Sequence, residues 1–264
     1  DDAPNQTFHA TAFPIASLLA SSWDDALLER VGEAMGAEAA AYGVDVFLTP
    51  ALNLHRHPLG GRNFEYYSED PLVSGKMAAA MIRGIQSQDV GTSAKHYAAN
   101  NHEWNRNTLD VKVSERALRE LYMKGFEIAV KESSPWTIMT SYNRINGTYT
   151  SESPWLLQDV LRDEWGFEGI VMTDWFAGAD AVKQMQAGKS QQQALLNAAR
   201  NGQLDVQVLD RNIERILDLI MRTRTFRHEP VSNRPDLDVH ARISRQAATE
   251  GMVLLKNERD ALPL

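Results

Sequence analysis

The chain has 264 residues, of which 43% are hydrophobic, with a formal net charge of −8 and no cysteine. This length can bury a sizeable core, while the acidic balance argues against nucleic acid as the main partner. The lack of cysteine excludes disulfides, thiolate nucleophiles and cysteine metal sites. No apolar run approaches the length of a membrane span, and no basic-then-apolar signal pattern opens the chain. We therefore expect a soluble protein without a membrane partner, cytoplasmic or secreted.

Helical and strand-like segments alternate as far as Thr173. Apolar residues recur at helical spacing from Trp23 to Tyr42, and a strand-like run follows from Val44 to Pro50. The later predicted elements of this part are helices over residues 71–86, 114–131 and 154–165 and strands over residues 92–97, 136–142 and 169–173. Strands that alternate with helices of this length favour a parallel sheet.

Beyond Gly188 the alternation stops. The pattern predicts a short helix near Ala194 to Asn201, a helix from Val206 to Met221 and a linker over residues 223–238 that contains Pro230 and Pro235. The run Met252 to Leu255 is strand-like and begins a further unit, so we expect the chain to be part of a longer protein. Only four strands are predicted in the first part. The expected fold is therefore α/β, a (β/α)8 TIM-barrel-like domain that is incomplete.

Chemically capable side chains stand where several predicted strands end. Asp174 follows strand 169–173, Lys95 and His96 close strand 92–97, and Tyr142 closes the strand that begins at Trp136. The carboxyl ends of parallel strands meet at one rim, where α/β barrels carry their active sites. A lone Asp in such a position is usually a helix cap or an ion-pair partner. The prediction of a site rests on the whole set.

Two further segments contribute groups that suit a sugar. Arg62 lies in a glycine-containing loop and offers five donors in a fixed fork, which fits vicinal hydroxyls as well as a carboxylate. An ion pair with Glu65 or Glu69 is the alternative role for this arginine. The stretch from Asn100 to Arg106 adds amides, an indole and a second arginine. Together these groups match the many hydroxyls and apolar C–H faces of a carbohydrate.

Competing chemistries find less support. His55 and His57 are two residues apart in a loop and no His-Glu-x-x-His motif occurs, so we expect no metal. No glycine-rich phosphate loop follows a strand, and we expect no nucleotide or other cofactor. Lys95 is able to form a Schiff base, as in aldolase-type barrels, and a lyase remains an alternative. The neighbouring His96 favours a hydrogen-bonded sugar site.

Ordered motifs along nearly the whole chain resemble glycoside hydrolase family 3, in its N-terminal barrel domain. The motifs are Ala10 to Pro14, Gly61 to Glu65, Glu69 to Pro71, Lys95 to Tyr97, Ser141 to Asn143, Asn146-Gly147 and Met172 to Trp175. The tail from Glu250 to Asn257 resembles the start of the family's second, α/β sandwich domain. We accordingly expect a barrel domain over residues 1–222, a linker over residues 223–238 and the start of a C-terminal domain over residues 239–264.

The resemblance implies roles for individual residues. Asp174 corresponds to the nucleophile of a retaining β-glycosidase, which forms a covalent glycosyl-enzyme. The substrate-binding residues implied are Arg62, Lys95, His96, Arg106, Tyr142 and Trp175. Positive charge on Lys95 and Arg62 would favour the ionised form of Asp174. The resemblance implies neither a cofactor nor a metal.

The residues after Lys95-His96 indicate the subclass. The family's N-acetylglucosaminidases resemble Lys-His-Phe-Pro-Gly-His-Gly here, whereas this chain continues Tyr97-Ala98-Ala99-Asn100-Asn101, as in the β-glucosidase branch. The implied substrates are small β-glucosides or oligosaccharides with a terminal non-reducing β-D-glucosyl residue. β-Xylosidase, β-N-acetylglucosaminidase and carbohydrate binding without turnover remain alternatives.

Three features depart from the family pattern. The acid/base glutamate is not identifiable in this chain, and we expect the C-terminal domain of the same protein to supply it and complete the site. Neither Asp1 nor Asp2 aligns with the family's Asp-Gly-Pro segment, which should precede Ala10. The stretch after Gly188 is shorter than the family pattern. These departures predict a truncated or segmentally incomplete chain.

Overall fold

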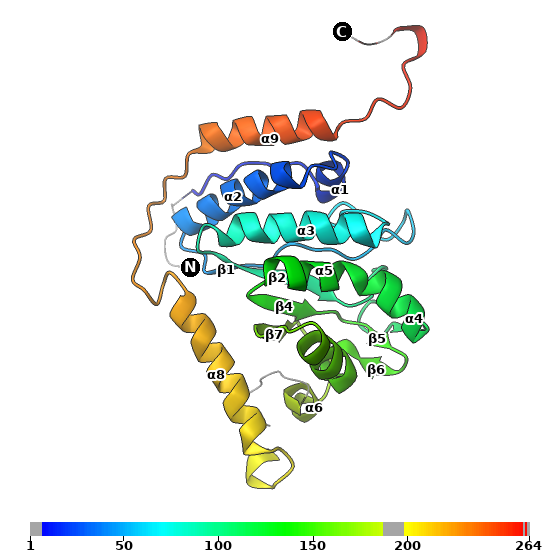
Figure 1. Ribbon diagram of the computed structural model, residues 1–264, viewed down its shortest axis with the longest axis vertical. Helices are drawn as coiled ribbons and strands as arrows, with labels where there is room; N and C mark the ends of the chain where they lie inside the picture. Colours follow the sequence, from blue (N-terminus) through cyan, green and yellow to red (C-terminus); the bar gives the residue numbers. More distant parts are fainter. Residues whose placement is uncertain (1–6, 187–197, 261, 263–264) are drawn as a thin grey trace.

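The computed structural model describes residues 7–186, 198–260 and 262, and its centre is a four-stranded parallel sheet (Figure 1). The strands run in the order β1-β2-β4-β7, with bounds Val46–Phe47, Gly91–Tyr97, Thr137–Thr140 and Ile170–Thr173. The predicted α/β architecture with a parallel sheet is confirmed. β1 is shorter than the predicted strand, because only two of its residues pair with β2.

Helices cover the sheet and begin where the sequence places capping residues. α2 (Asp25–Ala41) starts after Asp24, whose side chain accepts a hydrogen bond from Leu27 N at 2.9 Å. α3 (Pro71–Gln86) starts after Asp70, which accepts from two backbone amides, and proline occupies its first position. In Figure 1 these two helices lie side by side above the sheet, with α5 (Lys124–Ser133) next below α3.

The predicted helix over residues 114–131 is instead three joined pieces. A short α4 (Glu115–Ala117) leads into a π-helical turn, η1 (Leu118–Tyr122), and then into α5. Leu118 and Met123 are five residues apart and both are buried. A regular α-helix would turn them to different sides, whereas the wider turn directs both toward the core. The predicted helix over residues 154–165 is likewise π-helical, as η3 (Trp155–Glu164).

A second, small sheet was not predicted. It consists of β3 (Asp110–Val111), β5 (Arg144–Ile145) and β6 (Thr148–Tyr149), with β5 and β6 joined as an antiparallel hairpin. The connecting residues Asn146 and Gly147 have φ values of +50° and +98°, which Asn-Gly adopts readily in two-residue hairpin turns. The Asn-Gly pair was the available signal, but strands of two residues leave no periodicity.

The C-terminal part of the chain returns to the first helices. After α6 (Ala181–Gln186) and α8 (Val206–Arg222), α9 (Leu237–Gly251) packs against α1 (Ala16–Ala20) and α2. The buried contact of His240 Nδ1 with Glu38 Oε1, at 2.8 Å, fixes α9 on α2. The predicted division at residues 222 and 238 stays a prediction. The helix expected from Ala194 to Asn201 lies partly outside the described residues.

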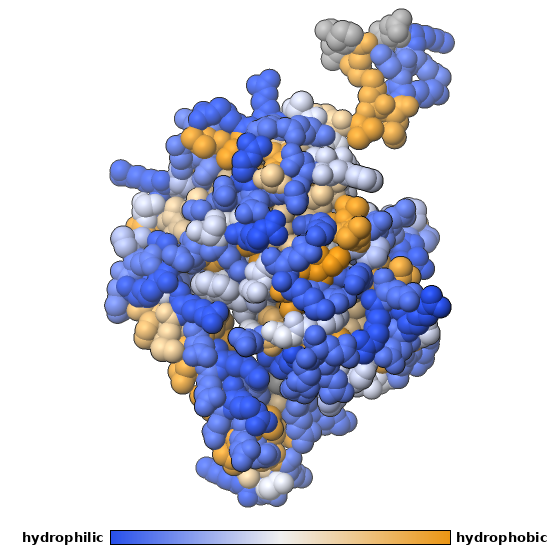
Figure 2. Space-filling model, viewed as in Figure 1, coloured by the Kyte–Doolittle hydropathy of each residue, from blue (hydrophilic) through white to orange (hydrophobic). Residues whose placement is uncertain are grey.

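The predicted strand from Met252 to Leu255 does not form in the described part of the chain. These residues extend away from the body after α9, and Figure 2 shows them as a separate hydrophobic segment. All four side chains are more than half exposed, Leu255 at 91%. A strand needs a neighbour to pair with, and this segment has none among the described residues.

Among the described helices, none combines the length and apolar character that a membrane crossing requires.

Candidate active site

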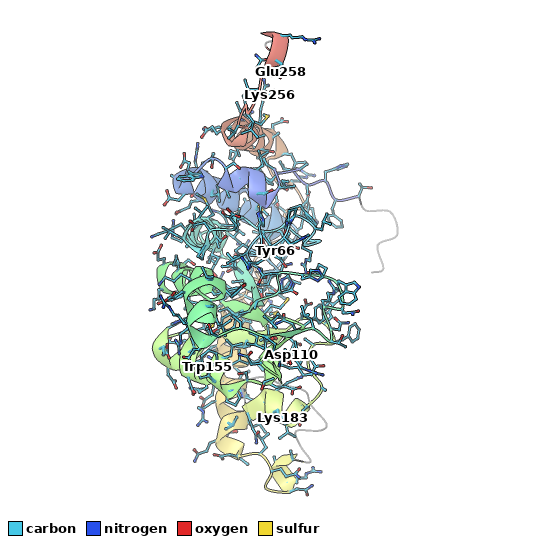
Figure 3. All side chains as sticks on the ribbon, turned by 90° about the vertical axis from the view of Figure 1, so that its right-hand side faces the viewer. Tyr66, Asp110, Trp155, Lys183, Lys256 and Glu258 are labelled. Atoms are coloured by element: carbon cyan, nitrogen blue, oxygen red, sulfur yellow. The ribbon has the colours of Figure 1, made fainter. Side chains whose placement is uncertain are left out.

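The carboxyl ends of β2, β4 and β7 bring the predicted strand-end residues to one rim. The three strands are adjacent and parallel, so their last residues lie at the same edge of the sheet. Asp174 N donates to Thr140 O at 3.2 Å, which continues the β4–β7 ladder by one bond and fixes Asp174 just past the strand. Figure 3 views the molecule from the right-hand side of Figure 1, and the label of Tyr66 lies near the middle of this face.

Polar groups surround the Asp174 carboxylate on several sides. His96 Nε2 lies 3.5 Å from Asp174 Oδ2, and Trp175 N donates to Asp174 Oδ1 at 2.8 Å. The hydroxyl of Tyr142 also hydrogen-bonds to Asp174, and burial, together with the charge of Asp174, raises the pKa of Tyr142. The tyrosine therefore stays protonated and donates. Asp174 itself keeps 14% of its side chain exposed, so a ligand can approach it from solvent.

His96 owes its position to a β-bulge. Lys95 pairs with Met139 and Tyr97 with Thr140, which leaves His96 as the extra residue between them. The side chain of Asn53 holds this bulge by accepting from His96 N and donating to His96 O, both at 2.9 Å. The bulge directs the imidazole toward Asp174 while Lys95 still reaches the rim.

The imidazole of His96 is neutral. Burial, and then the positive charges of Arg62, Lys95 and Arg106, hold the pKa of His96 well below its usual value. The 3.5 Å contact to Asp174 would be an ion pair only with a protonated imidazole. A side chain only 2% exposed beside three cations resists protonation, so this approach is a contact between Asp174 and a neutral ring rather than an ion pair.

Arg62 and Lys95 share one carboxylate, that of Glu65. Arg62 Nε and Nη2 lie 2.8 and 2.6 Å from Glu65 Oε2, and Lys95 Nζ lies 2.9 Å from Glu65 Oε1. Burial acts to raise the pKa of Glu65, but the hydrogen bond and charge of Lys95 and the charge of Arg62 lower it below its usual value. The ion pair weighed as an alternative role for Arg62 thus forms, and it includes a second predicted site residue.

Arg106 is held in a comparable way. Its guanidinium lies over the Tyr142 ring, 4.8 Å from the centroid, and Nη1 contacts Glu103 Oε2 at 2.8 Å. Asn100 Nδ2 donates to Glu103 Oε1 and to the Tyr66 hydroxyl, each at 3.1 Å. Glu65 and Glu103 were both missed as organisers of the site. Each of them had one signal in the sequence, namely that the glutamate lies three residues from an arginine.

The structure brings six of the seven predicted residues into this network and leaves one at its edge. Trp175 follows Asp174 directly but is 73% exposed, and the next residue, Phe176, is 95% exposed with a φ of +64°. Two large aromatic rings therefore project into solvent beside the carboxylate. Among the described residues, no three His, Asp or Glu side chains form a group that could hold a metal ion.

Comparison with known proteins identifies the family. Residues 4–222 match the family model described as the glycosyl hydrolase family 3 N terminal domain. The chain belongs to this family. The match confirms the resemblance seen in the sequence, and the glycoside hydrolase family 3 relatives of solved structure confirm the TIM-barrel-like fold class.

The relatives are close in sequence and structure but much longer. Thermostable beta-glucosidase B of Acetivibrio thermocellus is 46% identical over 98% of this chain, and exo-alpha-(1->6)-L-arabinopyranosidase of Bifidobacterium breve is 47% identical over 97%. The structure of beta-glucosidase 3B from Thermotoga neapolitana in complex with alpha-D-glucose superposes on the whole chain with a TM-score of 0.96 at 48% identity. The chain spans 35%, 34% and 39% of these three proteins, respectively.

Proposed function

We propose that this chain is the nucleophile-bearing part of a retaining β-glucosidase that releases terminal β-D-glucosyl residues from non-reducing ends. The observation that carries the proposal is a partly open Asp174 carboxylate that accepts from Tyr142 and faces neutral His96 at the carboxyl rim of the sheet. Two relatives support the choice of sugar, one named a beta-glucosidase and one solved with glucose.

In the first half of the reaction, an oxygen of Asp174 attacks the anomeric carbon. The bond from that carbon to the aglycone oxygen breaks with its electron pair, and an acid delivers a proton to the leaving oxygen. Tyr142 orients the carboxylate through a hydrogen bond from its neutral hydroxyl, and the neutral ring of His96 packs beside it. In the second half, water cleaves the glycosyl ester and gives its proton to the same acid, now acting as a base, which frees Asp174.

The remaining predicted residues bind the sugar. Arg62, Lys95 and Arg106 present donors to the hydroxyls of the non-reducing sugar, and Trp175 offers a flat indole beside it. The carboxylates of Glu65 and Glu103 balance nearby cations, which suits an uncharged substrate. Donors held in advance can strengthen their hydrogen bonds as the oxocarbenium-like transition state develops.

The acid/base residue is proposed to lie in a C-terminal domain of the same protein. Retention requires two carboxyl groups about 5 Å apart. The lowered pKa of Glu65 keeps it ionised, and Glu103 is engaged by Arg106 and Asn100, so neither is placed to donate a proton. The relatives are about three times as long as this chain, which leaves room for such a domain.

A second candidate is an α-L-arabinopyranosidase, which the name of the Bifidobacterium breve relative favours. Arabinopyranose lacks the hydroxymethyl group of glucose, as does the xylose of the β-xylosidase alternative. The deciding assay uses the two-domain protein, which is this chain together with its proposed C-terminal domain. It compares 4-nitrophenyl β-D-glucoside with the β-D-xyloside, the N-acetyl-β-D-glucosaminide and the α-L-arabinopyranoside. Highest kcat/KM on the glucoside supports the proposal, and highest kcat/KM on another glycoside replaces it.

The role of Asp174 is tested by Asp174→Asn with Asp180→Asn as the matched control. Asp180 lies in the same loop, but its carboxylate accepts from two amides at the start of α6. We expect the first substitution to lower kcat by about 10⁴-fold, as for removal of a nucleophilic system, and the control to stay near wild type. Glucose binding without any hydrolysis would indicate a binding domain, and borohydride trapping at Lys95 would indicate a lyase.

A further inference from the structure

Two of the proposed sugar-binding cations converge on one side chain, that of Glu65, which lies in the same loop as Arg62 and three residues after it. Arg62 belongs to the loop between β1 and α3, and Lys95 belongs to β2. Glu65 joins them, with one carboxylate oxygen on the guanidinium at 2.6 and 2.8 Å and the other on the ammonium at 2.9 Å. The three side chains are between 16% and 25% exposed, so this group of ion pairs is mostly buried but still reaches solvent.

Lys95 and Arg106 differ in the number of contacts that restrain their side chains. Arg106 has a second restraint, since it stacks over Tyr142 as well as pairing with Glu103. For Lys95, Glu65 is the one ion-pair partner within the described ranges. Lysine and arginine have more rotamer freedom to lose on binding than most side chains. An uncharged sugar hydroxyl orders them less strongly than a carboxylate does.

We infer that Glu65 is a positioning residue, which aligns Arg62 and Lys95 as a prearranged pair of donors for the sugar hydroxyls. The inference rests on the proposed function and deepens it. Glu65 acts through the two cations and does not itself touch the reacting atoms. Because its two oxygens each hold one cation, both donors are fixed relative to the sheet before substrate arrives, and binding need not order them.

The decisive variant is Glu65→Gln, with Glu132→Gln as its control. Glutamine keeps the shape but places an amide donor against a cation. Glu132 pairs with Lys76 Nζ at 2.7 Å between helices α3 and α5, outside the rim. In the two-domain protein, we expect Glu65→Gln to weaken competitive inhibition by D-glucose about 10- to 100-fold and to lower kcat/KM similarly, as for the loss of hydrogen bonds to charged groups. The control should retain wild-type values.

Two further variants separate positioning from a general loss of stability. Glu65→Asp is shorter and can hold only one cation at a time, so an intermediate loss is expected. In a Lys95→Met background, Glu65→Gln should cost clearly less than in the wild type, because part of what Glu65 aligns is already gone. Should Glu65→Gln fail to fold, the Glu65→Asp inhibition constant with and without Lys95→Met provides the same test.

Wild-type glucose inhibition in Glu65→Gln would overturn the inference, and so would an equal loss in both backgrounds accompanied by a lower Tm. Either result would leave the proposed function intact, provided that the wild type hydrolyses the glucoside. A wild-type protein that neither binds glucose nor hydrolyses any glycoside would overturn the proposed function, and this inference with it.

Discussion

Replacing His96 by glutamine tests whether the site holds a neutral imidazole or a charged one. The ring is 2% exposed and its Nε2 lies 3.5 Å from Asp174 Oδ2. Burial and three nearby cations hold the pKa of His96 well below 6.5 in the folded chain. His96→Gln keeps a polar side chain with a donor and removes the titration.

The expected magnitude follows from proton linkage. In the unfolded chain the imidazole takes up a proton as the pH falls through about 6.5, whereas folded His96 stays neutral, so acid favours unfolding. The stability that neutral His96 provides is complete above pH 6.5 and is lost below it. The loss relative to pH 7.5 is about 1.4 kcal/mol at pH 5.5 and about 2 kcal/mol at pH 5.0, as long as the folded ring remains unprotonated.

Urea unfolding of both proteins across this pH range provides the measurement. The free energy of unfolding of wild type minus that of His96→Gln should fall by about 2 kcal/mol from pH 7.5 to pH 5.0, and should be constant from pH 7.5 to 8.5. Parallel curves throughout would refute the reasoning. A wild type that gains relative stability as the pH falls would show the opposite sign, that of an imidazolium paired with Asp174.

Three further substitutions, the first with a matched glycine control, test the packing and the support of the rim. Gly84→Ala would place its Cβ 2.1 Å from a backbone oxygen of α2, so urea unfolding should show a loss of about 1–3 kcal/mol in the free energy of unfolding. Gly125→Ala, whose Cβ would lie 3.4 Å from its nearest neighbour, should be neutral or stabilising. Equal effects of the two substitutions would contradict the close packing at Gly84. Tyr142→Phe removes the hydrogen bond to Asp174 and should lower kcat/KM about tenfold, and an unchanged value would show that the hydroxyl does not serve the carboxylate. Glu152 Oε1 accepts hydrogen bonds from two backbone amides of the loop after Asp174, at 2.6 and 2.8 Å. Glu152→Gln should therefore speed the hydrogen exchange of these amides. Unaltered protection would mean that other contacts hold the loop.

Local signals in the sequence were sufficient for several elements and for the location of the rim. α3 was predicted with its observed bounds, because Asp70 and Pro71 mark its start and the apolar spacing runs unbroken to Gln86. The rim followed from a rule that needs no coordinates, since parallel strands end at the same edge. Asp174 and Tyr142 therefore meet as expected, although their strands are separated by a helix.

The missed features depend on contacts between distant segments. The spacing of Arg62 and Glu65 predicted their ion pair, but the third member, Lys95, arrives from a strand 30 positions further along the chain and only the fold brings it there. The bulge that directs His96 toward Asp174 depends on Asn53, which holds the backbone of that residue from another segment. A sequence pattern does not specify which residues of distant segments lie opposite one another, so neither contact was predictable.

Covalent labelling of Asp174 tests the central proposal most directly. The two-domain protein is incubated with an activated 2-deoxy-2-fluoro-β-D-glucoside, digested and mapped by mass spectrometry, with Asp174→Asn and Asp180→Asn run in parallel. A retaining nucleophile at this position should give one glycosylated peptide, that containing residues 170–176, with the label on Asp174, present in Asp180→Asn and absent in Asp174→Asn. A label on another residue, together with full hydrolytic activity in Asp174→Asn, would contradict the assignment of the nucleophile.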